Sequence, residues 1–328
     1  MRQLLSPIAR ILALTTLGVA VSLAVAPGVA VAAAPQVQTQ GPGFYRVMVG
    51  DFEVTALLDG THAFPIDTVV EGMPKADIKK DLDDDFLQPP VQGSINAFLI
   101  NTGSKLVLID AGAGSLYGPC CGRLQQNLRA AGYKPEQVDL VLLTHLHKDH
   151  AGGIAADGKM AFPNATVRVS KQEAAYWLGA GNKAKAPEFL STFFDAAVAS
   201  VQPYQAAKQF STFDGEGEMV PGIRAFRTPG HTPGHSSYLV TSRGKTLVVW
   251  GDIVHVASLQ FRELDATVKY DSSAQNAKTS RWELFEKLAK DRALVAAAHI
   301  SFPGLGHIRK KDGAFTWVPV NYEGDPAE

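Results

Sequence analysis

Three histidines and one aspartate fall within the short stretch THLHKDH, residues 144–150. The chain has nine histidines in all, so this density of metal-type ligands is unusual. A neutral imidazole binds borderline divalent ions such as zinc, and a carboxylate adds charge and can bridge two ions. The stretch therefore fits a metal site, a proton relay, or a polar loop that is merely rich in histidine.

Further residues of ligand type follow apolar runs that read as strands. The run VDLVLLT leads into THLHKDH, TLVVWGD ends in Asp252, and ALVAAAH ends in His299. The segment RTPGHTPGHS places His231 and His235 between Pro-Gly turns, after the expected strand GIRAFRT. Strand ends are rigid platforms, so this distribution indicates one site built from both halves of the chain.

The elements that must position these residues are strands, with helices between the later ones. The alternation and apolar runs predict strands at 51–60, 94–112, 138–144, 165–170, 222–228, 236–242, 246–252, 293–299 and 314–320, with a hairpin-like Thr-Gly-Ser turn within 94–112. Helical spacing predicts helices at 122–133, 171–179, 187–201 and 279–292, the last with Thr279 as its N-cap. Strands dominate, so two sheets with helices outside them fit better than one parallel sheet.

The composition is that of a globular protein, with 46% hydrophobic and 19% charged residues and a net charge of −1. This balance argues for neither nucleic acid nor an anionic membrane surface as a partner. The acidic run at 81–85 reads as a solvated face or a helix cap, and the basic run at 308–311 reads as a surface patch.

The first residues have the layout of a secretory signal peptide. Arg2 and Arg10 form a basic start, an apolar run follows, and Pro27 breaks that run before a tail of small residues. We expect cleavage after Ala32, or as late as position 34, leaving residues 33–328 as a single domain with a net charge of −1 − 2 = −3. The protein would then be periplasmic or secreted, without stable membrane association; an uncleaved membrane anchor is the alternative.

The only two cysteines, Cys120 and Cys121, are adjacent. Neighbouring cysteines can bond only in a strained ring, so we expect no stabilising disulfide framework from them. Small apolar filler near a helix start is the favoured interpretation over a redox role. The core, or bound metal, must then hold the fold together.

The chain resembles the metallo-β-lactamase fold superfamily. HLHKDH matches its H-x-H-x-D-H signature, and TPGHTPGH and WGD match its later metal motifs in the right order, so the resemblance covers residues 94–307. It implies an α/β fold, an αββα sandwich of two mixed β-sheets packed face to face with helices on the outer faces. It also implies two divalent ions, most simply zinc, although manganese, cobalt and iron also suit such ligands. One ion would be held by His145, His147 and His231, the other by Asp149, His150 and His299, with Asp252 bridging them.

A second resemblance is narrower. The segments DAGAGSLYGPCCGRLQQNLRAAGY, GDIVHV, AAHISFPGLGHIR and WVPVNY are similar to the methyl parathion hydrolase group of exported dinuclear hydrolases, whose related members act on lactones and aryl esters. This resemblance implies that Tyr117, Trp177 and Phe194 line the substrate pocket, and that a homodimer is possible. Tyr117 stands where the group has Phe, which could change the leaving group that fits. Without the resemblance, Trp177 and Phe194 read as core residues.

For the remaining polar residues near the motifs we expect supporting roles rather than metal binding. His235 reads as a hydrogen-bond partner of the site rather than a ligand. His255, three residues after Asp252, either polarises the substrate or is structural. Lys148 is expected to be a solvated side chain at a variable position, and His307 to be structural or a hydrogen-bond partner.

Together these expectations describe a dinuclear metallohydrolase. A hydroxide held between two ions about 4 Å apart would attack a small neutral lactone, aryl ester or organophosphate triester such as methyl parathion. Asp252 would hold the ions, and Asp149 would pass a proton to the leaving group.

Several other functions remain as alternatives. A β-lactamase is disfavoured because the true lactamases of this fold generally lack the bridging carboxylate. An iron-dependent redox enzyme could use the same ligands, although flavoprotein versions need an added cofactor domain. A nuclease is disfavoured because no basic stripe is present. A metal-binding protein without catalysis would show no turnover of any ester.

Overall fold

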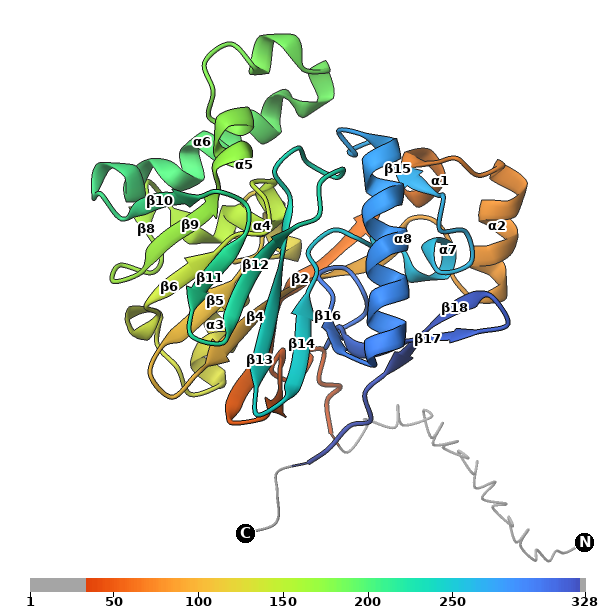
Figure 1. Ribbon diagram of the computed structural model, residues 1–328, viewed down its shortest axis with the longest axis horizontal. Coiled ribbons are helices and arrows are strands. Elements are labelled where there is room, and N and C mark those ends of the chain that lie inside the picture. The colour runs from red at the N-terminus through yellow and green to blue at the C-terminus, as the bar shows by residue number, and fades with distance from the viewer. Residues whose placement is uncertain (1–33, 325–328) are drawn as a thin grey trace, which may run out of the picture. The chain divides into compact units, whose positions relative to one another are not determined.

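The computed structural model describes residues 34–324, whose apolar strands pair into two seven-stranded mixed sheets (Figure 1). The first sheet has the order β1-β2-β4-β5-β6-β9-β10. Its strands are β1 (Phe44–Val49), β2 (Phe52–Phe64), β4 (Val91–Asn101), β5 (Leu106–Ile109), β6 (Leu140–Leu142), β9 (Thr166–Ser170) and β10 (Phe210–Phe213).

The second sheet has the order β11-β12-β13-β14-β16-β17-β18. Its strands are β11 (Gly217–Val220), β12 (Ile223–Arg227), β13 (Ser236–Ser242), β14 (Lys245–Val249), β16 (Leu294–Ala296), β17 (Leu305–Lys311) and β18 (Ala314–Pro319). Two short pairs complete the described strands: β3 (Val70–Glu71) with β15 (Thr267–Val268), and β7 (Ala155–Ala156) with β8 (Lys159–Met160).

The α-helices lie in the connections between strands. They are α1 (Ile66–Val69), α2 (Lys75–Asp84), α3 (Leu124–Ala130), α4 (Lys148–Ala151), α5 (Lys171–Trp177), α6 (Ser191–Ala206), α7 (Ala257–Gln260) and α8 (Ala274–Asp291). In Figure 1, α5 and α6 lie beside β9 and β10, and α8 runs along the second sheet.

Alternation of side chains along the strands builds the layers. In β13, Tyr238 and Val240 pack with Val54 and Ile100 of the first sheet, while Leu239 between them packs on the opposite side, toward α8. The first sheet buries its other face against α3, α5 and α6, and the second buries its other face against α8. The expected αββα sandwich is therefore confirmed.

Parallel pairing gathers several strand ends at one edge. In the first sheet β5, β6 and β9 are parallel, and in the second β14 and β16 are parallel. The segments that follow these strands contain Asp110, THLHKDH, Asp252 and His299. The carboxyl ends of parallel strands lie at the same edge of a sheet, so residues far apart in sequence meet there.

The expected hairpin-like turn is confirmed. The stretch 94–112 lies in two strands, β4 and β5, joined by a turn in which Thr102 N–H donates to the Lys105 carbonyl at 3.0 Å. The N-cap assignment to Thr279 is wrong: Ser273 caps α8 by accepting a hydrogen bond from Asn276 N–H at 3.3 Å. Thr279 lies inside the helix, where its hydroxyl donates to the Gln275 carbonyl. The first turn of α8 is polar and exposed, so hydrophobic periodicity does not reveal it.

The expected signal peptide, residues 1–32, lies outside the described residues, so its cleavage and export stay predictions. Within residues 34–324, no helix is both long enough and apolar enough to cross a membrane.

Candidate metal centre and substrate cavity

Seven buried side chains of ligand type form two neighbouring groups, which we call the ligand cluster. The ligand atoms within each group lie within 4.8 Å of one another. One group is His145, His147, His231 and Asp252, and the other is Asp149, His150 and His299. The loop after β6 and the short helix α4 supply four of these residues, the β12–β13 connection supplies His231, and the ends of β14 and β16 supply the rest.

Asp252 lies between the two groups, and its carboxylate contacts histidines of both; His299 Nε2 is near both oxygens, 3.2 Å from Oδ1 and 3.3 Å from Oδ2. Asp252 Oδ1 is also 3.0 Å from His150 Nε2. Its Oδ2 is 3.2 Å from His231 Nε2 and 3.7 Å from His145 Nε2. A carboxylate in this position can join two ions, one on each oxygen.

Each of four imidazoles has its second nitrogen fixed by a partner outside the cluster. The partners are Thr144 Oγ1 for His145 at 3.0 Å, Asp110 Oδ2 for His150 at 2.9 Å, Asp271 Oδ1 for His231 at 2.8 Å, and the Ser94 carbonyl for His299 at 2.9 Å. Such contacts fix the tautomer and the ring orientation, so they are typical of metal ligands.

Several ligand atoms of the cluster have no hydrogen-bond partner in the described part of the chain and are free to bind a metal. His145 Nε2, His150 Nε2 and Asp252 Oδ1 are buried and have no hydrogen-bond partner among residues 34–324. A buried polar atom without a partner costs about 1–3 kcal/mol, so three such atoms within the ligand cluster need an explanation. The residues present therefore fit two divalent ions.

Electrostatics favours the protonation states that metal ligands need. Burial lowers the pKa of His145 and His147 well below the ordinary value, which keeps these rings neutral. Burial alone would raise the pKa of Asp252, but the neighbouring imidazoles, His150 and His299 first, outweigh it and hold this pKa well below its usual range. Asp252 is therefore an ionised carboxylate.

Two buried carboxylates that the sequence analysis missed hold the ligand segments in place. Asp110 accepts hydrogen bonds from Thr144 N–H at 2.8 Å and from Thr144 Oγ1, besides contacting His150. Glu173 joins two ligand loops, because it accepts from Leu146 N–H at 2.9 Å and from Gly234 N–H at 3.0 Å. Asp110 follows a buried strand, as Asp252 does, and that pattern could have revealed it. Glu173 lies in a helix, and nothing in its sequence context marks it.

The two additional histidines lie against Asp252. His235 Nε2 accepts a hydrogen bond from Asp252 N–H at 3.0 Å, and its Nδ1 contacts Thr228 Oγ1 at 2.8 Å. Burial lowers the pKa of His235 to about 3, so its ring is neutral and can accept. His255 is also buried, with Nε2 3.1 Å from Asp252 Oδ2. Both side chains contact the ligand cluster from outside it.

A cavity of about 670 Å³ opens beside α4. Its wall consists of His62, Val69, Leu116, Tyr117, Lys148, Phe189, Thr192, Phe193, Lys269 and Tyr270, which we call the cavity wall. Burial raises the pKa of Tyr117 well above its ordinary value, and the Asp149 carboxylate raises it further. Phe193 of the cavity wall packs edge-on against the ligand His147, with ring centroids 4.9 Å apart, so the cavity adjoins the metal site.

Of the three aromatic residues expected in the pocket, only Tyr117 is part of the cavity wall. Trp177 and Phe194 are 1% and 2% exposed and pack in the core between the first sheet and its helices. The Trp177 ring packs edge-on against His147, with ring centroids 5.0 Å apart, so it supports a ligand from behind. On α6 successive residues point about 100° apart. Phe193 therefore reaches the cavity, and Phe194 does not.

Lys148 is not the solvated side chain that its place in the motif suggests. It is half-buried, and its Nζ lies 4.5 Å from the ring centroid of Tyr117 and 4.9 Å from that of Phe193. Burial lowers its pKa, although the nearby Asp149 opposes this effect. The cavity therefore has an ammonium group between two aromatic rings.

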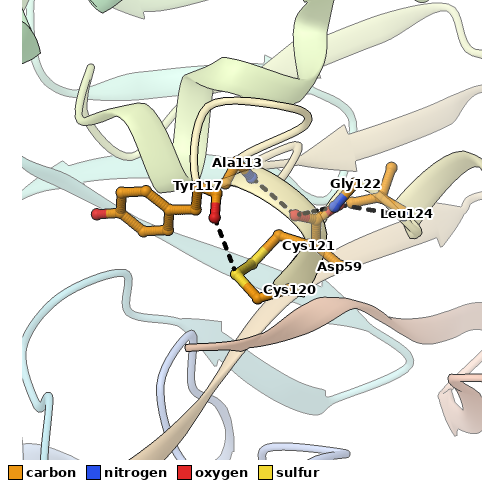
Figure 2. The surroundings of a disulfide bond; sticks show 7 residues. All are labelled: Asp59, Ala113, Tyr117, Cys120, Cys121, Gly122 and Leu124. Atoms are coloured by element: carbon orange, nitrogen blue, oxygen red, sulfur yellow. Dashed lines mark hydrogen bonds between the residues drawn. A yellow bond between two sulfur atoms is a disulfide. The ribbon is translucent and has the colours of Figure 1, made fainter. Parts of the chain in front are cut away.

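The expectation that Cys120 and Cys121 are apolar filler is wrong, because the two residues form a disulfide (Figure 2). They lie in the loop that follows β5, at and just after a single 3-10 turn, Gly118–Cys120. Figure 2 shows Tyr117 in the same loop, with its ring pointing away from the buried Asp59. The sequence shows that the cysteines are adjacent but not what surrounds them.

A comparison with protein families matches residues 90–299 to the metallo-beta-lactamase superfamily. The N-acyl homoserine lactonase of Bacillus cereus is 27% identical over 177 residues, which are 54% of this chain and 62% of that protein. The lactonase AttM of Agrobacterium fabrum is 33% identical over 118 residues, 34% of this chain and 40% of that protein. The alignments thus span less than two thirds of these curated relatives.

Solved structures match over more of the chain. The hydrolase AbOPH, of the beta lactamase superfamily, has a TM-score of 0.83 and 39% identity, covering 87% of this chain and 100% of that one. AidC, a dizinc quorum-quenching lactonase solved with its product, has a TM-score of 0.79 and 27% identity, covering 86% of this chain and 99% of that one.

Proposed function

Because the chain belongs to the metallo-beta-lactamase superfamily, we propose that it is a dinuclear metal-dependent hydrolase of small neutral esters, with a lactone as the leading substrate. The observation that carries the proposal is Asp252, whose carboxylate contacts histidines of both ligand groups beside an aromatic-lined cavity. The similarity to AidC and to N-acyl homoserine lactonases supports the lactone, and the dizinc site of AidC supports zinc.

Two divalent ions in this cluster would lower the pKa of a water molecule and polarise the oxygen of a carbonyl or phosphoryl group. The chain's own residues supply the rest. Asp252 holds the two ligand groups at a fixed separation, and the partners of the four imidazoles keep the rings oriented. Asp149 belongs to the cluster, and its neighbour Lys148 lines the cavity, so we assign to Asp149 the transfer of a proton to the leaving group.

The cavity wall suits the proposed substrates. Its aromatic residues can pack against an acyl chain or an aryl group and exclude water. Lys148 and Lys269 also line the cavity, and hydrolysis of a lactone or carboxylic ester releases a carboxylate that an ammonium group can pair with. Aryl esters and organophosphate triesters are neutral too, so they stand as second candidates.

A rate panel on zinc-reconstituted protein tests the proposal. It compares an N-acyl homoserine lactone, an aryl ester, methyl parathion and nitrocefin under the same conditions. We expect kcat/KM for the lactone to exceed that for nitrocefin by at least about 100-fold, which corresponds to about 2.7 kcal/mol of transition-state discrimination. Turnover of nitrocefin alone would show a β-lactamase, and visible absorption from bound iron with redox activity would show the redox alternative.

We also propose that the protein is exported, on the basis of the basic start, apolar run and small-residue tail of residues 1–32. Fractionation of the native host, with the N-terminus of the processed protein determined by mass spectrometry, tests this. A new N-terminus near residue 33 in the exported fraction is the expected result, and an intact N-terminus in the cytoplasmic fraction would contradict it.

A further inference from the structure

The part of the cavity wall that holds Tyr117 is a loop with few backbone ties to the rest of the fold. Within the described residues, the backbone N–H groups from 114 to 121 that form hydrogen bonds do so only within the loop, such as Leu116 to the Ala113 carbonyl and Gly118 to the Ser115 carbonyl. Something other than backbone pairing must therefore hold the tip of this loop.

The base of the loop is held by Asp59 (Figure 2). Its carboxylate is fully buried and accepts from Ala113 N–H at 2.9 Å, Gly122 N–H at 3.1 Å and Leu124 N–H at 3.1 Å. Three donors on one carboxyl group tie the two ends of the loop together. The tip, from Gly114 to Cys121, lies beyond this tie.

The disulfide holds the tip. Bonding of Cys120 to Cys121 closes a small ring through their shared peptide unit, so the backbone torsions between the two Cα atoms cannot rotate freely. Cys120 Sγ lies 3.4 Å from the Tyr117 carbonyl oxygen. The Cys120 carbonyl packs on β2, where a Cβ added at Gly60 would come 2.1 Å from it. The turn is thus in contact with both Tyr117 and the sheet.

The Tyr117 ring forms one side of the cavity. It stacks on His62, with ring centroids 4.6 Å apart and planes 25° apart, and it lies under the Lys148 ammonium group. A shift of this ring changes the width of the cavity next to Asp149. We propose that the Cys120–Cys121 disulfide is a positioning device that fixes Tyr117 and thereby sets the size of substrate that the cavity admits.

The first test measures the loop and needs no substrate. Hydrogen exchange of backbone amides is compared between the wild-type protein and a Cys120→Ala/Cys121→Ala variant, both loaded with zinc. We expect the amides of Leu116 and Gly118 to exchange about tenfold faster in the variant, because their local structure opens more often. The Leu128 amide in α3 is the internal control. Unchanged exchange at Leu116 and Gly118 would overturn the proposal.

The second test rests on the proposed hydrolytic function. It compares kcat/KM for a short-chain and a long-chain N-acyl homoserine lactone in the wild type, the double-alanine variant, Tyr117→Ala, and the combination of all three changes. We expect loss of the disulfide to change the long-to-short ratio about threefold to tenfold, mainly through KM, and to change it no further once Tyr117 is Ala. Tyr117→Phe, which retains the ring, should keep the dependence on the disulfide. An equal effect with and without Tyr117 contradicts the proposal.

A chemical route covers the case in which the variant does not fold. A water-soluble phosphine takes up oxygen from water as it is oxidised to the phosphine oxide, and the disulfide gains two hydrogens and becomes two thiols. Intact mass confirms the reduction, the zinc content is restored, and exchange and selectivity are measured before and after reoxidation. Reversible changes support the proposal, and identical values in both redox states refute it. If the wild type hydrolyses no ester or lactone, the proposed function fails, and the exchange result alone decides this inference.

Discussion

The ligand cluster and the cavity wall lie side by side, but different contacts hold them. In the ligand cluster, side chains come from strand ends, and His145, His150, His231 and His299 each have a second, fixed partner. In the cavity wall, Tyr117, His62, Lys148 and Phe193 contact one another through ring stacking and cation–ring contacts. Those contacts are weaker and less directional than hydrogen bonds to charged groups.

This difference indicates that the ligand cluster and the cavity wall have separate roles in catalysis and in substrate binding. Chemistry at a metal needs ligands held within about half an ångström, which polar networks on strand ends provide. A wall of rings on a loop can change its shape without disturbing that network. Changes to the cluster should therefore affect metal binding and catalysis, while changes to the wall should affect the binding of substrate and product and leave metal binding unchanged.

Replacing Asp252 should have the largest effect. Asp252→Ala removes the carboxylate that faces both ligand groups and leaves several imidazoles facing an apolar side chain. We expect kcat/KM to fall at least about 10³-fold and the protein to retain fewer than two zinc ions, measured by elemental analysis. Asp214→Ala, at an exposed position, is the matched control. A variant with two ions and full activity would show that the carboxylate is not a bridge.

Removing a partner of a ligand should have the next largest effect. Asp271 Oδ1 contacts His231 Nδ1 at 2.8 Å, and Asp271→Asn preserves the shape but removes the charge. We expect zinc affinity to fall about 10- to 100-fold, measured by competition with a chelator, with little change in selectivity among esters. A changed selectivity with unchanged affinity would reverse the division between cluster and wall.

The metal-free protein should lose stability as the pH rises above neutral. Burial opposes protonation of His231, but Asp252 and Asp271 outweigh it and raise its pKa to about 9, against 6.5 for an unperturbed imidazole. A raised pKa stabilises the folded state fully below pH about 6.5, and this contribution is lost as the pH rises to about 9. Unfolding by denaturant after chelation should show a loss on the order of a few kcal/mol across this window.

His231→Gln supplies the control for that measurement. The variant has no imidazole at this position, so its stability should decline less between pH 6.5 and about 9 than that of the metal-free wild type. With zinc bound, the wild type should not show this decline, because the metal requires the neutral ring. Parallel curves for the metal-free wild type and His231→Gln would contradict the raised pKa.

Changing the cavity wall should have the smallest effect. Lys148→Met preserves most of the apolar stem of the side chain but removes the ammonium group between Tyr117 and Phe193. We expect zinc content to stay the same and KM or product inhibition by the carboxylate to change about threefold to tenfold. Lys171→Met, at an exposed position, is the control. A loss of zinc in Lys148→Met would show that wall and cluster are not separable.

The prediction of the fold succeeded where periodicity was strong. In β13 the short apolar run from Tyr238 to Val240, flanked by Ser and Thr, predicts a strand, and the structure has one with the predicted bounds. It failed where local polarity concealed an element, as at the first turn of α8, which is capped by Ser273. A polar turn can be helical because the rest of the helix packs on the second sheet, and no local pattern records that packing.

The structure brings the seven ligand-type residues together, but of the three aromatic residues expected to line the pocket only Tyr117 does so. Phe193 and Phe194 are identical neighbours in the sequence, but one lines the cavity and the other is buried behind it. Which of the two faces the cavity depends on the rotation of α6 against the first sheet. The structural partners Glu173 and Asp271 were missed for the same reason, since their contacts lie far away in the sequence.

The sequence alone determined the chemistry available to this protein. The types of the ligand residues and their positions at strand ends are local features, and they can be predicted without knowing how the strands pack. It also determined the two-sheet architecture, through the period of its apolar residues. Only the tertiary structure decided the shape of the cavity: that Lys148 points inward, that Trp177 stands behind a ligand, and that a disulfide lies against Tyr117. These outcomes depend on how layers and loops pack against one another, and packing is a property of contacts between distant residues.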